Sequence, residues 1–442
     1  MTPGARVSAA IEVLADIDTR HRPAADALRD WGLSRRFAGS GDRAAIAGLV
    51  YDALRRRASA AFIMGEETPR AILLGALRLE RKHDTEAIAR LADGARFAPS
   101  PLTEEERKRL DTASLERAPA WVVGDYPDWL DPHLIRVFGD DRDAEGAALA
   151  RRAPLDLRVN TLKAKRETVA ATLAHLGAAP TRWSPVGLRV ALGADAKSPA
   201  INAEPAFLKG LIEVQDEGSQ LAVLLARTET DRQVVDLCAG GGGKTLALAA
   251  AMGGHGQIYA TDRDKRRLAP IHARIARAGA RNIQVRTPRG EAAPLTDLAG
   301  RSDLVLIDAP CTGTGAWRRN PDAKWRVRPG ALAARLKEQT TVFETAGGLV
   351  KPGGRIAYVT CSVLAEENDD QVRGFLERHD EFAAIPPGEV VKALGEQAPA
   401  FARAVLMSEL GVLMTPRRTD TDGFFVSVLA RVSKPIPASA SS

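Results

Sequence analysis

Two of the three cysteines in this chain stand directly after apolar segments, where a thiol could act as a nucleophile. Cys311 follows the segment DLVLIDAP, and Cys361 ends the segment RIAYVTC, 50 residues further along the chain. Both segments are typical of buried parallel strands, and the carboxyl ends of such strands meet at the ligand-binding edge of an open α/β sheet. A lone buried cysteine is most often a small apolar residue. Two cysteines at one edge instead predict a functional pair of thiols.

A thiol pair of this kind suits the methylation of a pyrimidine at carbon C5. This carbon is a weak nucleophile, but addition of a thiolate at C6 pushes electron density onto C5 as an enamine. Cysteine is suited to the addition because its thiolate is strongly nucleophilic, even where only a small fraction is ionised. An acid near the ring nitrogen would assist, and Asp308 lies three residues before Cys311. We therefore predict that Asp308 takes part in catalysis.

A glycine-rich segment, DLCAGGGGKT, offers a site for the methyl donor. Glycines in the first strand-to-helix turn of an α/β sheet let the backbone approach a nucleoside ligand closely. Asp262 ends the next predicted strand, QIYATD, 22 residues after Gly240. A carboxylate at this spacing can accept hydrogen bonds from ribose hydroxyls. We therefore predict S-adenosylmethionine as the cofactor.

The same segment also has features of the phosphate-binding loop of ATPases. That loop needs a glycine, four residues of any kind and then Gly-Lys-Ser/Thr. Gly243, Lys244 and Thr245 match its end, but Cys238 stands where its first glycine is required. An RNA-dependent ATPase and an inactive RNA-binding protein remain the alternatives from other classes. The ATPase hypothesis predicts magnesium-dependent binding of ATP.

These residues must be positioned by several domains, because a chain of 442 residues exceeds the usual size of a single domain. Residues 1–140 carry apolar side chains at three- and four-residue spacing, which predicts an all-α domain. Residues 141–220 predict a small α/β module of RRM-like type. Residues 221–432 alternate short buried strands with helices and predict a Rossmann-like parallel sheet. Residues 433–442 predict a disordered tail.

Basic residues follow Cys311 closely and predict a nucleic-acid partner. Arg318, Arg319 and Lys324 lie in a segment that also holds two tryptophans. Basic side chains with interleaved aromatic rings suit phosphate contacts and base stacking on single-stranded RNA. The 62 Lys and Arg exceed the 56 Asp and Glu, and the formal charge of +6 mildly favours a polyanionic partner. We expect these three residues to contact RNA; a solvated basic loop is the alternative.

Other features exclude several classes of protein. Three cysteines suit a reducing cytoplasm rather than a disulfide-stapled secreted domain. The His and Cys residues do not have the spacing of a metal site. The N-terminal segment lacks the apolar core of a secretory signal, and no stretch reaches about 18 apolar residues. We expect a cytoplasmic monomer that uses no metal and contacts no membrane.

Taken together, these motifs resemble the RsmB/Sun (Fmu) family of RNA cytosine-5 methyltransferases. The resemblance spans roughly residues 150–432. Its most specific feature is the pair of Pro-Cys and Thr-Cys motifs. The segments that carry it are LRVN, VQDEGSQL, DLCAGGGGKT, ATD, DAPCTGTGAWRRNPDAKW, LVKPGGRIAYVTCSVLAEEN and DGFF.

The resemblance implies a division of roles between the cysteines: Cys361 attacks the base, and Cys311 assists release of the methylated product. It also implies that residues 1–140 form a NusB-like RNA-binding domain. Small-subunit ribosomal RNA is the implied substrate, with transfer RNA as the nearest alternative. The residues implied to lie against the cofactor are Cys238, Ala239, Gly240, Gly241, Gly242, Gly243, Lys244, Asp262 and Asp308.

The sequence departs from the family pattern in two places. Position 241 is glycine where the family usually has proline, which would loosen the loop without abolishing cofactor binding. The family usually carries an acid after the third strand, near the adenine. Here Pro288 stands about where that acid should be, and Glu291 is the nearest carboxylate. One adenine contact of the family therefore has no assigned counterpart in this chain.

Overall fold

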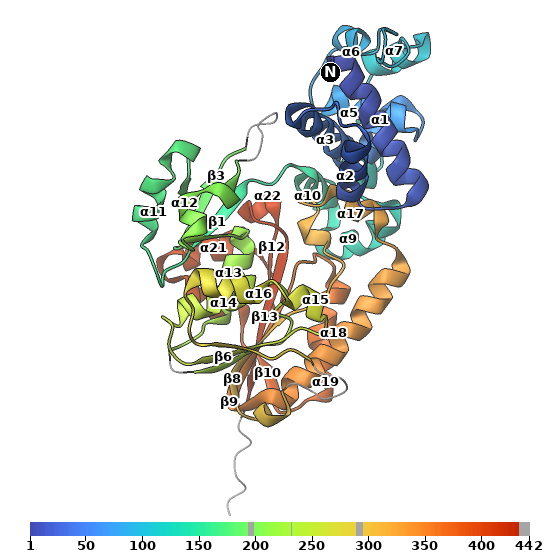
Figure 1. Cartoon of the computed structure of the whole chain (residues 1–442). Helices are drawn as coiled ribbons and strands as arrows, with labels where there is room; N and C mark the ends of the chain where they lie inside the picture. Colours follow the sequence, from blue (N-terminus) through green and yellow to red (C-terminus); the bar gives the residue numbers. More distant parts are fainter. Residues whose placement is uncertain (193–198, 231, 289–294, 433–442) are drawn as a thin grey trace, which may run out of the picture. The chain divides into compact units, whose positions relative to one another are not determined.

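The structure is a computed structural model, and the residues that it describes are 1–192, 199–230, 232–288 and 295–432. The chain forms two compact units (Figure 1). The first, called the helical unit, contains Met1–Ala153 and Ala316–Arg328. The second, called the α/β unit, contains most of the other described residues. The expected tail, 433–442, and Glu291 lie outside the described residues.

The described part of the helical unit is built from α-helices and short 3-10 turns, as its apolar spacing predicts. Thr2, Thr68 and Thr103 cap three of the helices, since each side chain accepts a backbone N–H from the first turn. The all-α prediction is confirmed, and the NusB-like character stays a prediction. The α-helices are α1 (Pro3–Arg20), α2 (Ala24–Ser34), α3 (Ser40–Arg55), α4 (Arg57–Met64), α5 (Pro69–Leu79), α6 (Thr85–Leu91), α7 (Glu104–Asp111), α8 (Ala120–Val123), α9 (Asp131–Phe138), α10 (Arg142–Ala150) and α17 (Pro321–Arg326).

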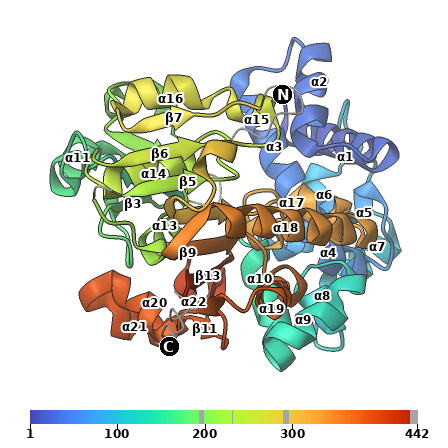
Figure 2. The same cartoon turned by 90° about the horizontal axis from the view of Figure 1, so that it is seen from below.

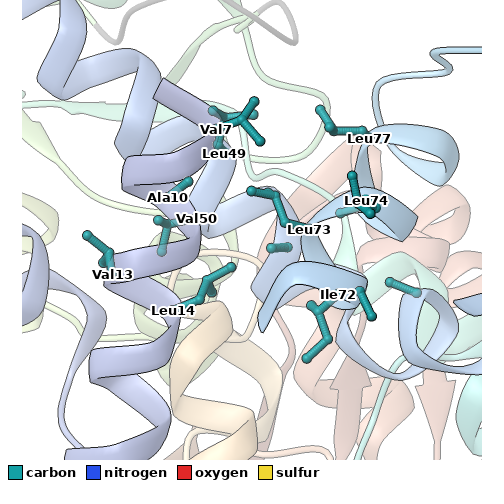
Figure 3. Packing of buried hydrophobic residues seen from close by; sticks show 14 of the residues in the cluster. Val7, Ala10, Val13, Leu14, Leu49, Val50, Ile72, Leu73, Leu74 and Leu77 are labelled. Carbon is teal, nitrogen blue, oxygen red and sulfur yellow. The ribbon is translucent and has the colours of Figure 1, made fainter. Parts of the chain in front are cut away.

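The core of the helical unit lies where α1, α3 and α5 meet (Figure 3). Val7, Ala10 and Leu14 recur at three- and four-residue spacing, so one face of α1 is apolar and buried. Val50 of α3 and Leu73 of α5 pack into the same cluster and are at most 1% exposed. Full burial of a side chain such as Leu or Val contributes roughly 1.5–3 kcal/mol, so this cluster accounts for much of the stability of the unit.

The segment Ala316–Arg328 interrupts the α/β unit in the chain but packs within the helical unit, where α17 contacts α3. Lys324 is 1% exposed, and its Nζ donates hydrogen bonds to the carbonyl oxygens of Arg55, at 3.1 Å, and Asp125. Burial lowers the pKa of Lys324 to about 7. These contacts join the segment to the helices of the unit.

The α/β unit begins with a small antiparallel sheet, in the order β2-β3-β1-β4. Its connecting helices include α11 (Arg166–Thr172) and α12 (Pro205–Leu208). A sheet of this size with its own helices agrees with the small α/β module that the sequence predicts. The strands are β1 (Leu155–Val159), β2 (Ala179–Pro180), β3 (Gly187–Val190) and β4 (Ile212–Val214).

A larger sheet follows, in the order β11-β12-β13-β9-β8-β5-β6-β7, with β10 paired to β13. The strands from β9 to β7 are parallel, and β13 is antiparallel to β9. Figure 2 shows the run from β7 through β6 and β5 to β9 and β13. The strands are β5 (Gln233–Asp236), β6 (Gln257–Ala260), β7 (Ile283–Val285), β8 (Ser302–Asp308), β9 (Val350–Thr360), β10 (Phe382–Ala384), β11 (Leu406–Met407), β12 (Val412–Met414) and β13 (Phe424–Arg431).

Helices cover both faces of the large sheet, so its strands are buried and their sequences are almost continuously apolar. Val234, Leu306 and Val359 point to the face covered by α13 (Glu217–Ala226) and α14 (Gly243–Ala251). Tyr358, next in the chain to Val359, points to the other face. There it stacks on Phe343 of α18 (Pro329–Leu349), with 4.3 Å between the ring centroids. The Rossmann-like prediction is confirmed.

The direction of the chain through the sheet reverses between β5 and β8. From β5 the chain runs outward through β6 and β7, then returns to place β8 and β9 on the opposite side of β5. Open α/β sheets bind ligands at such a reversal, outside the carboxyl ends of the strands. Among the described residues, no helix is both long enough and apolar enough to span a membrane.

Candidate active site at the carboxyl edge of the large sheet

The structure brings the two cysteines together. Cys361 directly follows β9, and Cys311 lies three residues beyond the end of β8, its parallel neighbour. Their Sγ atoms are 3.3 Å apart, and both are free thiols with half-buried side chains. The pairing of β8 with β9 explains this proximity, because adjacent parallel strands end side by side.

The Cys311 thiol holds its proton tightly. The hydrogen bond to Cys361, burial and the nearby charge of Glu367 all raise the pKa of the Cys311 thiol well above its usual value. Cys311 therefore stays protonated and can donate a hydrogen bond to the sulfur of Cys361.

The glycine segment forms the turn between β5 and α14, and α14 begins at Gly243. Gly240 and Gly242 have φ values of 49° and 83°, which favour glycine. A Cβ at Gly242 would also lie 2.5 Å from the side chain of Ile271. Arg274 Nη1 donates to the carbonyl of Gly241 over 2.7 Å. The turn thus depends on its glycines and on one external guanidinium.

Asp262 lies beside this turn, just beyond β6 (Gln257–Ala260). Its Oδ2 accepts the backbone N–H of Gly240 over 3.0 Å, and its Oδ1 accepts that of Asp264 over 2.8 Å. The carboxylate is therefore held in place while its remaining lone pairs stay available as acceptors. This is the arrangement that the sequence predicts for a ribose-binding acid.

Asp236, the last residue of β5, is fully buried below the turn. Its Oδ2 accepts a hydrogen bond from Thr245 Oγ1 over 2.6 Å, whereas its Oδ1 has no hydrogen-bond partner among the described residues. Burial raises the pKa of Asp236 to about 7. An acceptor without a recorded donor, next to a glycine turn and the carboxylate of Asp262, fits a nucleoside ligand that also carries an ammonium group, as S-adenosylmethionine does.

Lys244 and Asp308 form an ion pair between the turn and the cysteines, in which Lys244 is buried and Asp308 is partly exposed. Lys244 Nζ lies 2.8 Å from Asp308 Oδ1 and 5.0 Å from the ring centroid of Phe424. Burial lowers the pKa of Lys244, but the charge and hydrogen bond of Asp308, together with the charges of Cys361 and Asp236, raise it, and the net pKa lies above its usual value. Lys244 is therefore a cation that faces both Asp308 and Cys361.

Cys238 and Ala239 lead into the turn, and Ala239 donates its N–H to the carbonyl of Thr261 over 2.8 Å. Burial raises the pKa of Cys238 well above its usual value, so this third thiol stays protonated. Cys238 is thus a small side chain at the start of the turn and not a further nucleophile.

The predicted RNA contacts need a correction at Lys324. Its amino group is buried and bonded to backbone carbonyls inside the helical unit, so it does not contact phosphate. The basic, tryptophan-bearing pattern predicted a surface loop, but the segment folds as α17 against α3. Arg318 binds the unit through its carbonyl, which accepts from Arg55 Nη1 over 2.7 Å. The Arg318 side chain is buried as well, at 2% exposed, so the predicted RNA contact is corrected there too. RNA contact by the side chain of Arg319 stays a prediction.

Sequence reasoning missed two residues that support the cysteines. Glu367 and Asn368 are both at most 2% exposed and hydrogen-bonded to the segments that carry Cys311 and Cys361. The only signal in the sequence was their position a few residues after Cys361. Nothing in that position distinguishes a buried acceptor from a solvated helix start.

The fold and this site define a methyltransferase that depends on S-adenosylmethionine. The model of the family described as 16S rRNA methyltransferase RsmB/F matches residues 222–430, and that of the RsmF/B-like ferredoxin-like domain matches residues 126–196. The chain belongs to the RsmB/F methyltransferase family.

Named relatives agree with this assignment. A probable ribosomal RNA small subunit methyltransferase B of Synechocystis sp. is 33% identical over 313 residues, which cover 69% of this chain and 67% of the relative. The ribosomal RNA small subunit methyltransferase B of Citrobacter koseri is 30% identical over 311 residues, which cover 69% of this chain and 66% of that protein. The match thus spans about two thirds of each relative.

Solved structures share the fold. The crystal structure of PH0851 has a TM-score of 0.69 and 25% identity, and the match covers 97% of this chain and 99% of the other. NSun6 from Pyrococcus horikoshii, in a crystal structure with the S-adenosylmethionine analogue SFG, has a TM-score of 0.59 and 21% identity. That match covers 71% of this chain and 100% of NSun6.

Proposed function

We propose that this protein methylates carbon C5 of a cytosine in small-subunit ribosomal RNA. The observation that carries the proposal is the 3.3 Å separation of the Cys311 and Cys361 sulfurs at the ligand-binding edge of a methyltransferase sheet. A second thiol at this distance has no use in direct transfer to a nucleophilic atom. It is useful where one sulfur must bond to the substrate and then leave.

The cofactor site is the glycine turn with its two acids. Asp262 would accept from the ribose hydroxyls, and Asp236 would face the ammonium group of the methionine part. S-adenosylmethionine supplies an electrophilic methyl group when bound. The residues of this chain hold the base, the nucleophile and the protons.

The reaction begins with the thiolate of Cys361, which forms a bond to C6 of the cytosine. The electron pair of the C5–C6 double bond moves toward the ring nitrogen N3, and Lys244 with Asp308 delivers a proton there. The Lys244 ammonium is the proton source that the 2.8 Å ion pair supports, with Asp308 as the acceptor that orients it. C5 is then nucleophilic enough to take the methyl group.

Release reverses the addition. Once C5 is methylated, its proton passes to a base and the proton on N3 returns to Lys244. The C5–C6 double bond re-forms, and the C6–S bond breaks with its electron pair returning to Cys361. The Cys311 thiol, held protonated beside that sulfur, donates a hydrogen bond to the departing thiolate. This role for Cys311 agrees with the one that the family resemblance implies.

RNA recognition would involve the helical unit as well as the α/β unit. A C5 carbon inside a helical stack is out of reach, so the target cytosine must be looped out or flipped. We propose that the helical unit is the NusB-like RNA-binding part and that Arg319 contributes to it. A ribosomal substrate also fits a cytoplasmic protein.

The test is a methyl-transfer assay with labelled S-adenosylmethionine and separated ribosomal and transfer RNA from a strain that lacks the modification. The expected result is label at one cytosine of small-subunit ribosomal RNA, and none with Cys361→Ala. Label in transfer RNA would move the substrate to the alternative within this class. Magnesium-dependent ATP binding without methyl transfer would replace the proposal by the ATPase hypothesis.

A further inference from the structure

Glu367 holds the segment that carries Cys311 on both sides of that cysteine. Its Oε1 accepts the backbone N–H of Thr312 over 2.8 Å, and its Oε2 accepts the hydroxyl of the same residue. Gln339 Nε2 donates to Glu367 Oε1 over 3.0 Å and to the carbonyl of Pro310 over 2.9 Å. The two chain neighbours of Cys311 are therefore fixed through one carboxylate.

Asn368 holds the segment that carries Cys361 in the same way. Its Oδ1 accepts the hydroxyl of Thr360 over 2.5 Å, and its Nδ2 donates to the carbonyl of Ser362 over 3.0 Å. These are the two chain neighbours of Cys361. Glu367 and Asn368 thus each hold one cysteine through its two chain neighbours. Because they are consecutive residues, their Cα atoms lie only about 3.8 Å apart, so the two sets of contacts start from one point of the backbone.

The peptide that joins Glu367 to Asn368 is itself anchored to the sheet. Tyr358 of β9, fully buried, donates its hydroxyl to the carbonyl of Glu367 over 2.7 Å. A buried carboxylate is costly unless its oxygens are hydrogen-bonded. The donors recorded for Glu367 are neutral, so filling space or balancing charge does not account for an acid here. The acid is explained by its two acceptor oxygens, which are held in a fixed geometry and both accept hydrogen bonds.

We propose that Glu367 and Asn368 are positioning residues that together set the spacing of the two reactive sulfurs. Glu367 positions Cys311 for release of the product, and Asn368 positions Cys361 for attack on the base. The roles in attack and release rest on the proposed function. The spacing of the sulfurs does not, and it can be measured without RNA.

The two residues therefore give different defects. Glu367→Gln places an amide N–H₂ against a donor of Thr312, which displaces Cys311 while Cys361 stays held by Asn368. Asn368→Ala removes both contacts of Cys361 and leaves the contacts of Cys311. Loss of Glu367 slows release of the covalent RNA adduct, whereas loss of Asn368 slows its formation.

The kinetic test follows formation and decay of the RNA adduct on denaturing gels in single-turnover reactions of the full-length protein. Glu367→Gln is expected to lengthen the lifetime of the adduct by about tenfold, or about 1.4 kcal/mol, with little change in its formation. Asn368→Ala is expected to slow formation by a similar factor. Thr312→Val, which removes one hydroxyl donor, should give a milder form of the Glu367→Gln defect. Glu377→Gln, the same change at an exposed site of α19 (Asp369–Arg378), is the matched control.

The second test oxidises the purified protein with diamide and locates the disulfide by peptide mass mapping. The azo bond of diamide takes up the two thiol hydrogens as the sulfurs join. Wild type and Glu377→Gln are expected to form the Cys311–Cys361 disulfide quickly, and Glu367→Gln and Asn368→Ala several-fold more slowly. Wild-type rates in both variants would overturn the proposal, whatever the RNA assay shows. Slower oxidation in both variants would support it even if the wild-type protein proved unable to methylate RNA. Equal slowing of adduct formation and decay by Glu367→Gln would also overturn the separate roles.

Discussion

Lys244 Nζ lies 2.8 Å from Asp308 Oδ1 in an ion pair whose lysine is only 7% exposed. The sequence suggests Asp308 alone as the acid, because it stands three residues before Cys311. The structure pairs it with a cation from the start of α14. In the mechanism that we propose, Lys244 is therefore the proton donor.

Removal of that cation should impair chemistry far more than folding. Lys244→Met keeps the length and apolar stem of the side chain but removes the proton donor. Loss of a positioned acid typically costs a factor of about 10²–10⁴ in rate. We expect a fall of that order in the single-turnover rate of methyl transfer. Lys265→Met, at an exposed position, is the control, and equal rates for the two variants would show that Lys244 is not the donor.

Cofactor affinity should depend on pH through Asp236. Burial raises the pKa of this carboxyl to about 7, and a bound ammonium group would favour its ionised form. Binding below pH 7 must then release a proton, so affinity for S-adenosylmethionine should rise as pH rises toward 7 and level off above it. Asp236→Asn should bind more weakly and without this dependence. Calorimetric titrations between pH 5.5 and 8.5 check both, and an unchanged pH profile in the variant would contradict the assignment.

Stability should depend on pH through Lys324. Its folded pKa is lowered by burial from 10.5 to about 7. The unfolded chain therefore binds more protons than the folded chain between these values, and stability rises with pH across this window. The slope is at most about 1.4 kcal/mol per pH unit for one proton. Urea unfolding of Lys324→Met should show a smaller gain between pH 7 and 9 than wild type, and identical gains would contradict a buried neutral amine.

Arg274 should restrict the glycine turn at position 241, where the wider family usually has a proline. Arg274 Nη1 donates to Gly241 over 2.7 Å, and a Cβ at Gly241 would lie 3.2 Å from the same nitrogen. Gly241→Pro should therefore weaken cofactor binding a few-fold in the wild-type protein, because the ring crowds the guanidinium. In the Arg274→Ala background, Gly241→Pro should strengthen cofactor binding, because the proline restricts the conformations of the unbound turn. Calorimetry on the four proteins tests this change of sign, and additive effects would contradict it.

The sequence was sufficient for the parts of the fold that leave a periodic pattern. Apolar spacing predicted the all-α helical unit, and runs such as QVVDLC and DLVLIDAP predicted strands of the parallel sheet. Those runs also placed Cys311 and Cys361 at one edge, since each follows a strand whose carboxyl end carries function. Such patterns are visible in the sequence because each buried position of a helix or strand requires an apolar residue.

Other features depend on contacts between distant segments and leave no such pattern. The burial of Lys324 requires carbonyl partners about 200 residues or more away in the chain, Asp125 and Arg55. The roles of Glu367 and Asn368 require knowledge of which segments they face. The pairing of Lys244 with Asp308 likewise joins the start of α14 to the end of β8, which come together because β5 pairs with β8.

The most direct test of the central claim is whether Cys361 bonds to RNA. Cys311→Ala should be mixed with S-adenosylmethionine and small-subunit ribosomal RNA and resolved on a denaturing gel. The account predicts a shifted protein–RNA band that accumulates in Cys311→Ala and is absent from Cys311→Ala/Cys361→Ala. Methyl transfer by Cys361→Ala, or a shifted band that persists without Cys361, would contradict it.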